Sequence, residues 1–253
     1  MADIEVYAAI VGRAKRHHCL MFHLSPQHDD VELVYPFWVL RERSLVTLID
    51  TGFSAPVAET RGILEYRDPT ALLVELGIVP GDVERIVLSH LHYDHFGAPE
   101  RYPNARFIVQ RDDVSFFCGP GRIQPAGALA DPPSIAALDD LRRADRLEIL
   151  DGDKSLGGGL AVVRIGGHTP GSQLIVLERR DGPVVFACDG SHFYENARTK
   201  TPSAIIYRYD EYQRGFASIE RLAAGGRWFP GHDPAMLERL DPVHERVYAL
   251  RDA

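Results

Sequence analysis

The chain has 253 residues, and 45% of them are hydrophobic, which is enough apolar content for a sizeable buried core. Its 28 basic and 36 acidic residues give a net charge of −8, which argues against a nucleic-acid-binding protein. The N-terminus has no apolar segment after a basic start, and no stretch has the length of a membrane span. These features predict a cytoplasmic protein without a membrane partner, and three irregularly spaced cysteines predict no disulfide framework.

The first fifty residues predict a β-rich opening. Residues 4–10 and 20–24 have the composition of strands, and a polar turn over residues 13–18 joins them. Residues 34–40 and 45–49 predict a pair of strands in a hairpin.

The next segment alternates between helix and strand. Residues 70–76 have helical spacing, with Asp68 as a candidate N-cap and Gly77 as the stop. Residues 85–88 are an apolar run typical of a buried strand, and residues 106–110 predict another strand.

The second half predicts further strands and helices without a linker. We expect residues 112–146 to be helical or irregular, with a helix that opens at residues 132–134. Four strands and a final helix should follow, over residues 147–150, 160–165, 173–177, 184–187 and 210–224. The loop-like residues 118–127 are interpreted as an excursion within one domain that covers residues 1–253.

Residues 88–97 place four metal-capable side chains within six positions, namely His90, His92, Asp94 and His95. They follow an apolar strand, and strand-end loops commonly hold the chemistry of α/β proteins. In an extended loop, His90 and His92 project to the same side and can bind one ion, while Asp94 and His95 can face a second. Imidazole and carboxylate ligands suit Zn²⁺, and also Mn²⁺, Co²⁺ or Fe²⁺. The alternative is a chance cluster on a solvated loop, which the preceding apolar strand disfavours.

The pattern His-x-His-x-Asp-His resembles the signature of the metallo-β-lactamase superfamily, and the further motifs of that family follow in its order. His168 lies in Gly-Gly-His-Thr-Pro-Gly, Asp189 in Cys-Asp-Gly and His232 in Phe-Pro-Gly-His-Asp. Upstream, Asp50 ends a predicted strand in Asp-Thr-Gly. The resemblance implies that Asp50 orients the metal site, and an ordinary turn or capping aspartate is the alternative.

The resemblance also implies a fold and a branch of the family. The fold is an αββα sandwich, in which two mixed β-sheets lie face to face and helices flank them. Residues 96–97 and 102–111 look closer to the N-acyl-homoserine lactonase branch than to the antibiotic-hydrolysing branch.

The family's chemistry implies two divalent metal ions, with zinc favoured over manganese, cobalt or iron. The resemblance assigns His90, His92 and His168 to the first ion, assigns Asp94, His95 and His232 to the second, and lets Asp189 bridge the two. A metal-bridging hydroxide would then attack the carbonyl of a lactone and open the ring. Asp94 is also a candidate to pass the proton to the leaving alkoxide.

One position departs from the lactonase-like pattern. That branch usually has a tyrosine three residues after the bridging aspartate, where this chain has His192. Neutral imidazole can still donate a hydrogen bond to a carbonyl, so His192 is a candidate catalytic residue, and packing beside its aromatic neighbours is the alternative. Tyr194 is the second candidate for the same role. Phe116 and Phe117 could line the substrate pocket or fill the core.

Three functions remain open from the sequence. The first is lactone hydrolysis, with a small-molecule lactone or ester as the substrate and a homodimer left open. The second is hydrolysis of a thioester or another ester or amide, as in glyoxalase II of the same superfamily. The third is a non-catalytic binding protein, which is disfavoured because none of the seven candidate ligands is missing.

Overall fold

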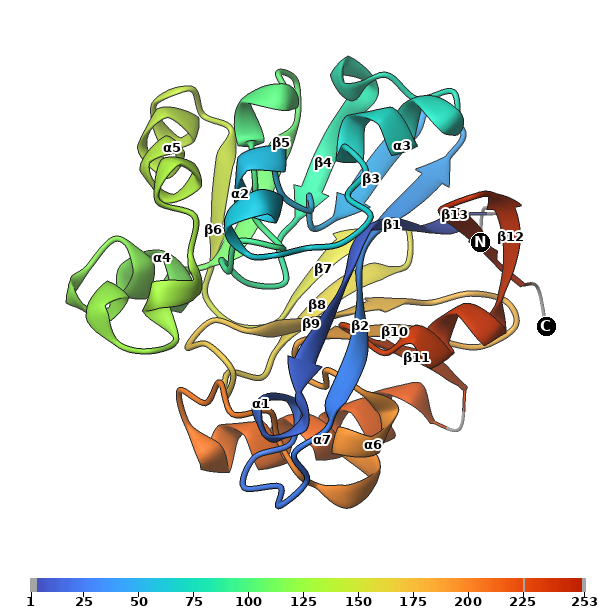
Figure 1. Cartoon of the computed structure of the whole chain (residues 1–253). Helices are drawn as coiled ribbons and strands as arrows, with labels where there is room; N and C mark the ends of the chain where they lie inside the picture. Colours follow the sequence, from blue (N-terminus) through green and yellow to red (C-terminus); the bar gives the residue numbers. More distant parts are fainter. Residues whose placement is uncertain (1–3, 225, 252–253) are drawn as a thin grey trace.

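The structure is a computed structural model that describes residues 4–224 and 226–251. Two β-sheets lie face to face in the middle of these residues, and helices pack on the outer faces (Figure 1). This is the αββα arrangement that the sequence analysis predicted, and the prediction is confirmed.

The first sheet has eight strands in the order β12-β13-β1-β2-β3-β4-β5-β6 within the described residues. Strands β3 to β6 are parallel, and the others pair antiparallel, so the sheet is mixed. Its strands are β1 (Glu5–His17), β2 (Asp30–Glu42), β3 (Leu45–Ile49), β4 (Val83–Val87), β5 (Arg106–Gln110), β6 (Leu147–Leu150), β12 (Leu240–His244) and β13 (Val247–Leu250).

The second sheet has five strands in the order β11-β10-β9-β8-β7 in the same part of the chain. Only β10 and β11 are parallel to each other there. Its strands are β7 (Lys154–Gly157), β8 (Leu160–Arg164), β9 (Gln173–Leu177), β10 (Val184–Cys188) and β11 (Arg227–Pro230).

The helices are short, and none of those described has the length and apolarity to cross a membrane. The α-helices are α1 (His18–Met21), α2 (Ala55–Thr60), α3 (Pro69–Glu75), α4 (Arg111–Phe117), α5 (Pro132–Arg143), α6 (Tyr194–Thr199) and α7 (Tyr209–Ala223). The 3-10 helices are η1 (Pro80–Asp82), η2 (Pro99–Arg101), η3 (Pro120–Ile123), η4 (Gly127–Leu129) and η5 (Pro234–Arg239). As predicted, the side chain of Asp68 caps α3 by accepting from the backbone N–H of Thr70 at 2.9 Å.

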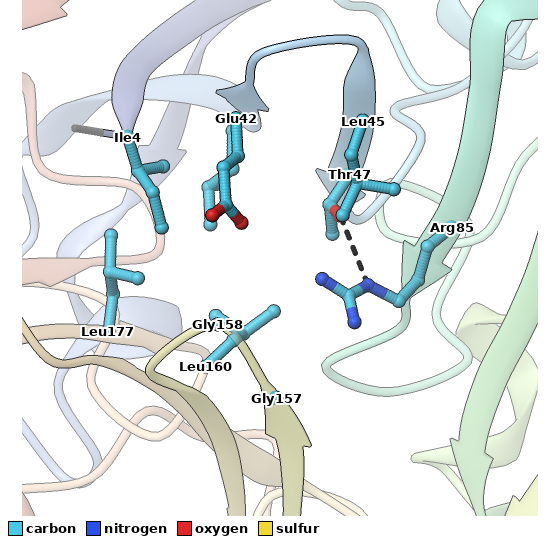
Figure 2. A pocket seen from close by; sticks show the side chains of 10 residues that line it. Ile4, Glu42, Leu45, Thr47, Arg85, Gly157, Gly158, Leu160 and Leu177 are labelled. Atoms are coloured by element: carbon cyan, nitrogen blue, oxygen red, sulfur yellow. Dashed lines mark hydrogen bonds between the residues drawn. The ribbon is translucent and has the colours of Figure 1, made fainter. Parts of the chain in front are cut away.

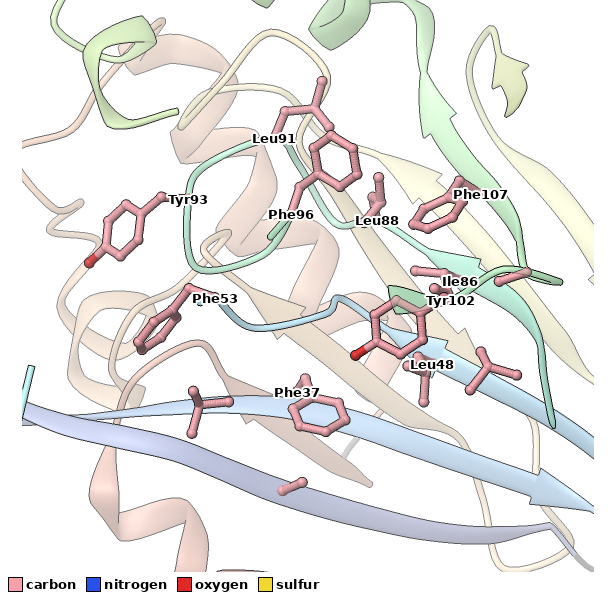
Figure 3. Close-up of a cluster of buried hydrophobic side chains, with 14 of the residues drawn as sticks. Phe37, Leu48, Phe53, Ile86, Leu88, Leu91, Tyr93, Phe96, Tyr102 and Phe107 are labelled. Atoms are coloured by element: carbon pink, nitrogen blue, oxygen red, sulfur yellow. The ribbon is translucent and has the colours of Figure 1, made fainter. Parts of the chain in front are cut away.

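Successive side chains of a strand point to opposite faces of its sheet, and this alternation explains how the two sheets and the helices form layers. In β2, Phe37 belongs to the apolar cluster under α2, α3 and α5, while its neighbour Trp38 points between the sheets. Trp38 packs there against Phe186 and Phe229 of the second sheet, with ring centroids 4.7 and 4.8 Å away. The cluster that contains Phe37, called here the outer cluster of the first sheet, is shown in Figure 3. Phe53 and residues of the loop after β4 also pack in this cluster. This packing fixes the strand ends from which the site residues project.

Several strands differ from the sequence prediction. The expected strand over residues 20–24 is wrong, because α1 and a turn lie there, and the expected turn over residues 13–18 is mostly strand. β1 continues to His17 because it pairs with the long strand β2 as far as Asp30. Strands β7, β11, β12 and β13 were not predicted, since they carry little apolar periodicity.

A small cavity lies between the two sheets, where residues of β2, β3 and β4 face residues of β7, β8 and β9 (Figure 2). Its volume is about 10 Å³, and its lining includes Glu42, Thr47, Arg85 and Gly158. The guanidinium of Arg85 donates to the hydroxyl of Thr47 at 3.0 Å and to the carbonyl of Leu156 at 2.9 Å. A cavity of this size has room for one water molecule and no larger ligand.

Candidate metal centre

The candidate site lies where strands of both sheets end. The loop after β4 carries residues 88–97, and Asp50 follows the neighbouring strand β3. From the second sheet, the turn between β8 and β9 carries His168, the end of β10 is followed by Asp189, and the end of β11 is followed by His232. A side chain at Gly231 would overlap the carboxylate of Asp189, so glycine is required between β11 and the last histidine.

The first group of ligand atoms comes from His90, His92, His168 and Asp189, all of which are buried. The Nδ1 atom of His92 lies 2.9 Å from Nε2 of His90 and 2.9 Å from Nε2 of His168. One carboxylate oxygen of Asp189, Oδ2, lies 3.1 Å from Nε2 of His168 and 3.8 Å from Nε2 of His90. Three imidazole nitrogens and one carboxylate oxygen therefore face one point.

The second group comes from Asp94, His95 and His232, which are also buried. The Oδ2 atom of Asp94 lies 3.5 Å from Nε2 of both His95 and His232. The other carboxylate oxygen of Asp189, Oδ1, lies 3.3 Å from Nε2 of His95 and 3.0 Å from Nε2 of His232. Asp189 thus presents one oxygen to each group.

Each of the five candidate imidazole ligands directs one ring nitrogen inward, toward the other ligand atoms, and the other nitrogen outward. The partners of the outward nitrogens show that these groups fit metal ions. Each outer nitrogen meets an oxygen that can accept its proton, which leaves the inward nitrogen free of one. The pairs are His90 Nδ1 with Ser89 Oγ at 3.1 Å, His92 Nε2 with Ala126 O at 2.8 Å, His95 Nδ1 with Asp50 Oδ2 at 2.7 Å, His168 Nδ1 with Ile205 O at 3.0 Å, and His232 Nδ1 with Val34 O at 3.0 Å. Inward lone pairs that face each other repel unless a cation lies between them. Nε2 of His95 and Oδ1 of Asp189 are buried without a hydrogen bond, as expected of ligand atoms.

The pKa shifts divide these histidines into two sets. Burial lowers the pKa of His90 and His92 well below the usual value, so both are neutral, as metal ligands must be. Burial also acts on His95 and His232, but nearby carboxylates outweigh it and raise the pKa of both. A cation beside Asp94 and Asp189 would displace those protons.

Two residues hold the ligand loops in place. Asp50 lies where the resemblance implied, since its Oδ1 accepts from the backbone N–H of Ser89 at 2.7 Å while its Oδ2 meets His95. Asp113 of α4 was not predicted. Its carboxylate accepts from the backbone N–H of Gly171 at 2.6 Å and of Leu91 at 3.2 Å, and so connects the His168 turn to the His90 loop. Burial raises the pKa of Asp113 to about 6, and the two N–H donors favour the ionised form.

The two candidate catalytic residues lie in different places. His192 is buried at the site, where its Nε2 lies 3.2 Å from Oδ2 of Asp189 and its Nδ1 lies 3.3 Å from the hydroxyl of Tyr212. Tyr194 begins α6, and its hydroxyl donates to the carbonyl of Trp228 at 3.2 Å. Arg239 covers its ring at 4.3 Å, so the structure does not bring Tyr194 to the site.

A cavity of about 230 Å³ opens beside the two groups. Its lining combines site residues with apolar, phenolic and basic side chains. The residues are Arg16, Leu20, Met21, Leu33, Tyr35, Arg61, Tyr93, Leu129, Asp189, His192, Ile205 and His232. Phe116 and Phe117 are not part of this lining and pack in the outer cluster of the first sheet, although the ring of Phe117 lies 5.7 Å from that of His92.

The fold and the paired groups of candidate ligands are typical of a class of protein with two stacked sheets and a candidate metal centre at the strand ends. The family model of the metallo-beta-lactamase superfamily matches residues 33–237. The chain belongs to this superfamily.

Its relatives include N-acyl homoserine lactonases. AttM from Azorhizobium caulinodans is 28% identical over 92% of this chain and 95% of its own length. An N-acyl homoserine lactonase from Bacillus sp. is 30% identical over 86% of both chains. The solved structure of a quorum-quenching N-acyl homoserine lactone lactonase superposes with a TM-score of 0.82 at 21% identity, and the match covers 96% of this chain and 98% of that one. This structural likeness shows the fold.

Proposed function

We propose that the protein is a metal-dependent hydrolase that opens a lactone ring with two divalent ions. The observation that carries the proposal is the set of five imidazoles whose inward nitrogens converge on the two oxygens of one buried carboxylate. The two relatives described above each cover at least 86% of this chain and are N-acyl homoserine lactonases, which favours a lactone over other esters. Because ligands come from both sheets, we propose that residues 1–253 act as one domain.

Each ion has its own residues. His90, His92 and His168 would hold the first ion, Asp94, His95 and His232 would hold the second, and Asp189 would bridge them. Five imidazoles and two carboxylates, with no thiolate among them, suit zinc, and manganese, cobalt or iron are also compatible. When bound, the ions would generate hydroxide from water near neutral pH and polarise the carbonyl oxygen.

Residues of the chain would stabilise the developing charge, supply a proton to the leaving group and exclude water. His192 lines the cavity and, in the tautomer that carries its proton on Nε2, would donate a hydrogen bond to the carbonyl oxygen as it gains negative charge. Asp94, buried beside His95 and His232, would hold the proton that the leaving alkoxide needs. Apolar residues such as Leu33 and Leu129 would exclude bulk water around the substrate.

The metal content tests the dinuclear site. We expect the mildly purified protein to contain two equivalents of divalent metal by elemental analysis, because complete ligand sets exist for both ions. A protein that saturates at one equivalent, held by His90, His92 and His168 alone, would contradict the dinuclear proposal.

The substrate class needs a panel assay. The metal-loaded protein should be tested with short- and long-chain lactones, aromatic lactones, thioesters and β-lactams. Ring opening of lactones alone supports the proposal, whereas faster turnover of thioesters would favour the glyoxalase II-like alternative.

The role of His192 is tested by truncation. We expect His192→Ala to lower kcat at least about tenfold, or roughly 1.4 kcal/mol, with metal content unchanged. Tyr194→Phe is the matched control and should leave kcat unchanged, because its hydroxyl is directed to Trp228. Unchanged kinetics in His192→Ala would remove the residue from the mechanism, and loss of metal in that variant would make it a ligand instead.

A further inference from the structure

Two arginines line the cavity beside the metal centre. Arg16 lies near the end of β1, Arg61 is the C-cap residue of α2, and both are half-buried. The same cavity is lined by His192, His232 and Asp189. A substrate whose carbonyl reaches those residues therefore shares one small space with two guanidinium groups.

Neither arginine has an acidic partner among the described residues. The guanidinium of Arg16 donates to the backbone carbonyls of Arg61 at 2.8 Å and Lys15 at 2.9 Å. The guanidinium of Arg61 donates to the carbonyl of Ala128 at 3.4 Å. The basic residues around them are paired, since Arg13 faces Glu65 at 3.5 Å, Lys15 faces Glu32 at 3.9 Å and Arg67 faces Glu75 at 2.6 Å.

An acid that shares a neighbouring hollow with Arg61 is already engaged elsewhere. Asp131 lines a neighbouring hollow of about 270 Å³ together with Arg61. Its carboxylate caps α5 by accepting from the hydroxyl of Ser134 at 2.6 Å and from the backbone N–H of the same residue at 3.3 Å. The N–H groups of Arg16 and Arg61 that remain unused are therefore available to a ligand.

The position of Arg61 is fixed by its packing. Its guanidinium lies 4.5 Å from the centre of the Tyr93 ring. This cation–π contact holds the planar group in place at the cavity wall. The hydroxyl of Tyr93 donates to that of Tyr35 at 3.4 Å, and the Tyr93 ring lies 5.9 Å from that of Phe53 (Figure 3). A guanidinium held in this way loses little freedom when it binds an anion.

We propose that Arg16 and Arg61 bind a carboxylate of the substrate, so that the enzyme acts on compact lactones or esters that carry a negative charge beside the scissile bond. A half-buried guanidinium without a counter-ion is costly to retain, and its planar fork matches a carboxylate. The volume of about 230 Å³ is below the usual range of about 300–1,000 Å³ for ligand pockets, which favours a small substrate. The inference rests on the proposed function, because that function supplies the scissile carbonyl.

The kinetic test uses a matched pair of substrates, a γ-lactone that carries a carboxylate and its methyl ester. The wild-type enzyme should have a kcat/KM at least about tenfold higher for the acid, since hydrogen bonds to charged groups contribute this much. Arg16→Gln and Arg61→Gln should each reduce that preference through KM, and the double variant should abolish it. Lys15→Gln is the control, because its side chain is exposed and paired with Glu32.

A binding test separates this inference from the proposed function. With metal-loaded protein in a calorimeter, glutarate should bind about tenfold more tightly than butyrate, because only glutarate has a second carboxylate. The double variant should bind the two equally, and Arg61→Lys, which keeps the charge without the fork, should bind glutarate with intermediate affinity. If the protein prefers glutarate but turns over no lactone, the proposed anion site is supported and the proposed lactonase function is contradicted. Equal binding of both acids by the wild-type protein, or an undiminished preference in a folded double variant, would overturn the anion site.

Discussion

Replacing Asp189 by alanine should remove both metal ions and lower turnover at least about a thousandfold, or roughly 4 kcal/mol. The reason is that Asp189 presents Oδ2 to His168 at 3.1 Å and Oδ1 to His232 at 3.0 Å, so one substitution removes a ligand from each group. Metal content by elemental analysis and kcat on a lactone that the wild type opens are the measurements.

His232→Ala separates the two ions, because His232 faces only the second group. We expect it to retain one equivalent of metal while Asp189→Ala retains less. Near-ultraviolet circular dichroism should confirm that both variants are folded. Wild-type metal content and hydrolysis in a folded Asp189→Ala protein would show that this carboxylate is not the bridge.

Asp113→Ala should weaken metal binding by about 10- to 100-fold, which is typical when a group that holds a metal ligand in place is lost. It should also destabilise the fold by about 3 kcal/mol, since the buried N–H groups of Gly171 and Leu91 lose their acceptor. A chelator competition assay measures the first effect, and urea unfolding measures the second.

Two further variants make the Asp113 test specific. Asp113→Asn keeps the size and one acceptor oxygen, so it should lie between the wild type and Asp113→Ala. Asp112→Ala removes the neighbouring carboxylate on the same helix, which is 48% exposed and bonds to Arg164 at 2.6 Å, and should leave metal affinity unchanged. If Asp113→Ala and Asp112→Ala behave alike, Asp113 does not position the ligand loops.

The candidate site residues could be named from the sequence because residue type and local motif carry the chemistry that they would supply. The structure brings together every residue that the sequence singled out as a ligand, from His90 to His232, although these lie in separate segments. His192 could also be placed, since its position is fixed by the turn that follows Asp189. The direction of the Tyr194 side chain was not predictable, because it depends on where α6 begins and on a carbonyl of β11.

Residues whose roles depend on partners far away in the sequence could not be identified from a local motif. Asp113 is an unremarkable acidic residue of α4 until the fold places Gly171 beside it. Arg16 and Arg61 likewise become notable only when their lack of acidic partners can be seen. The strand over residues 240–244 was missed for a different reason, since its side chains are mostly exposed and it contains Pro242, which suits an edge strand.

The supply of ligands from both sheets has a consequence for how the protein is made and how long it lasts. During synthesis the loop of His90 leaves the ribosome well before His232, so the complete centre cannot form on a growing chain that lacks β11. Once both groups are filled, the ions would act as cross-links between the two sheets and would close long stretches of chain, much as a disulfide does. The lifetime of the folded protein would then depend on how well the cell supplies metal to a chain that has just been completed.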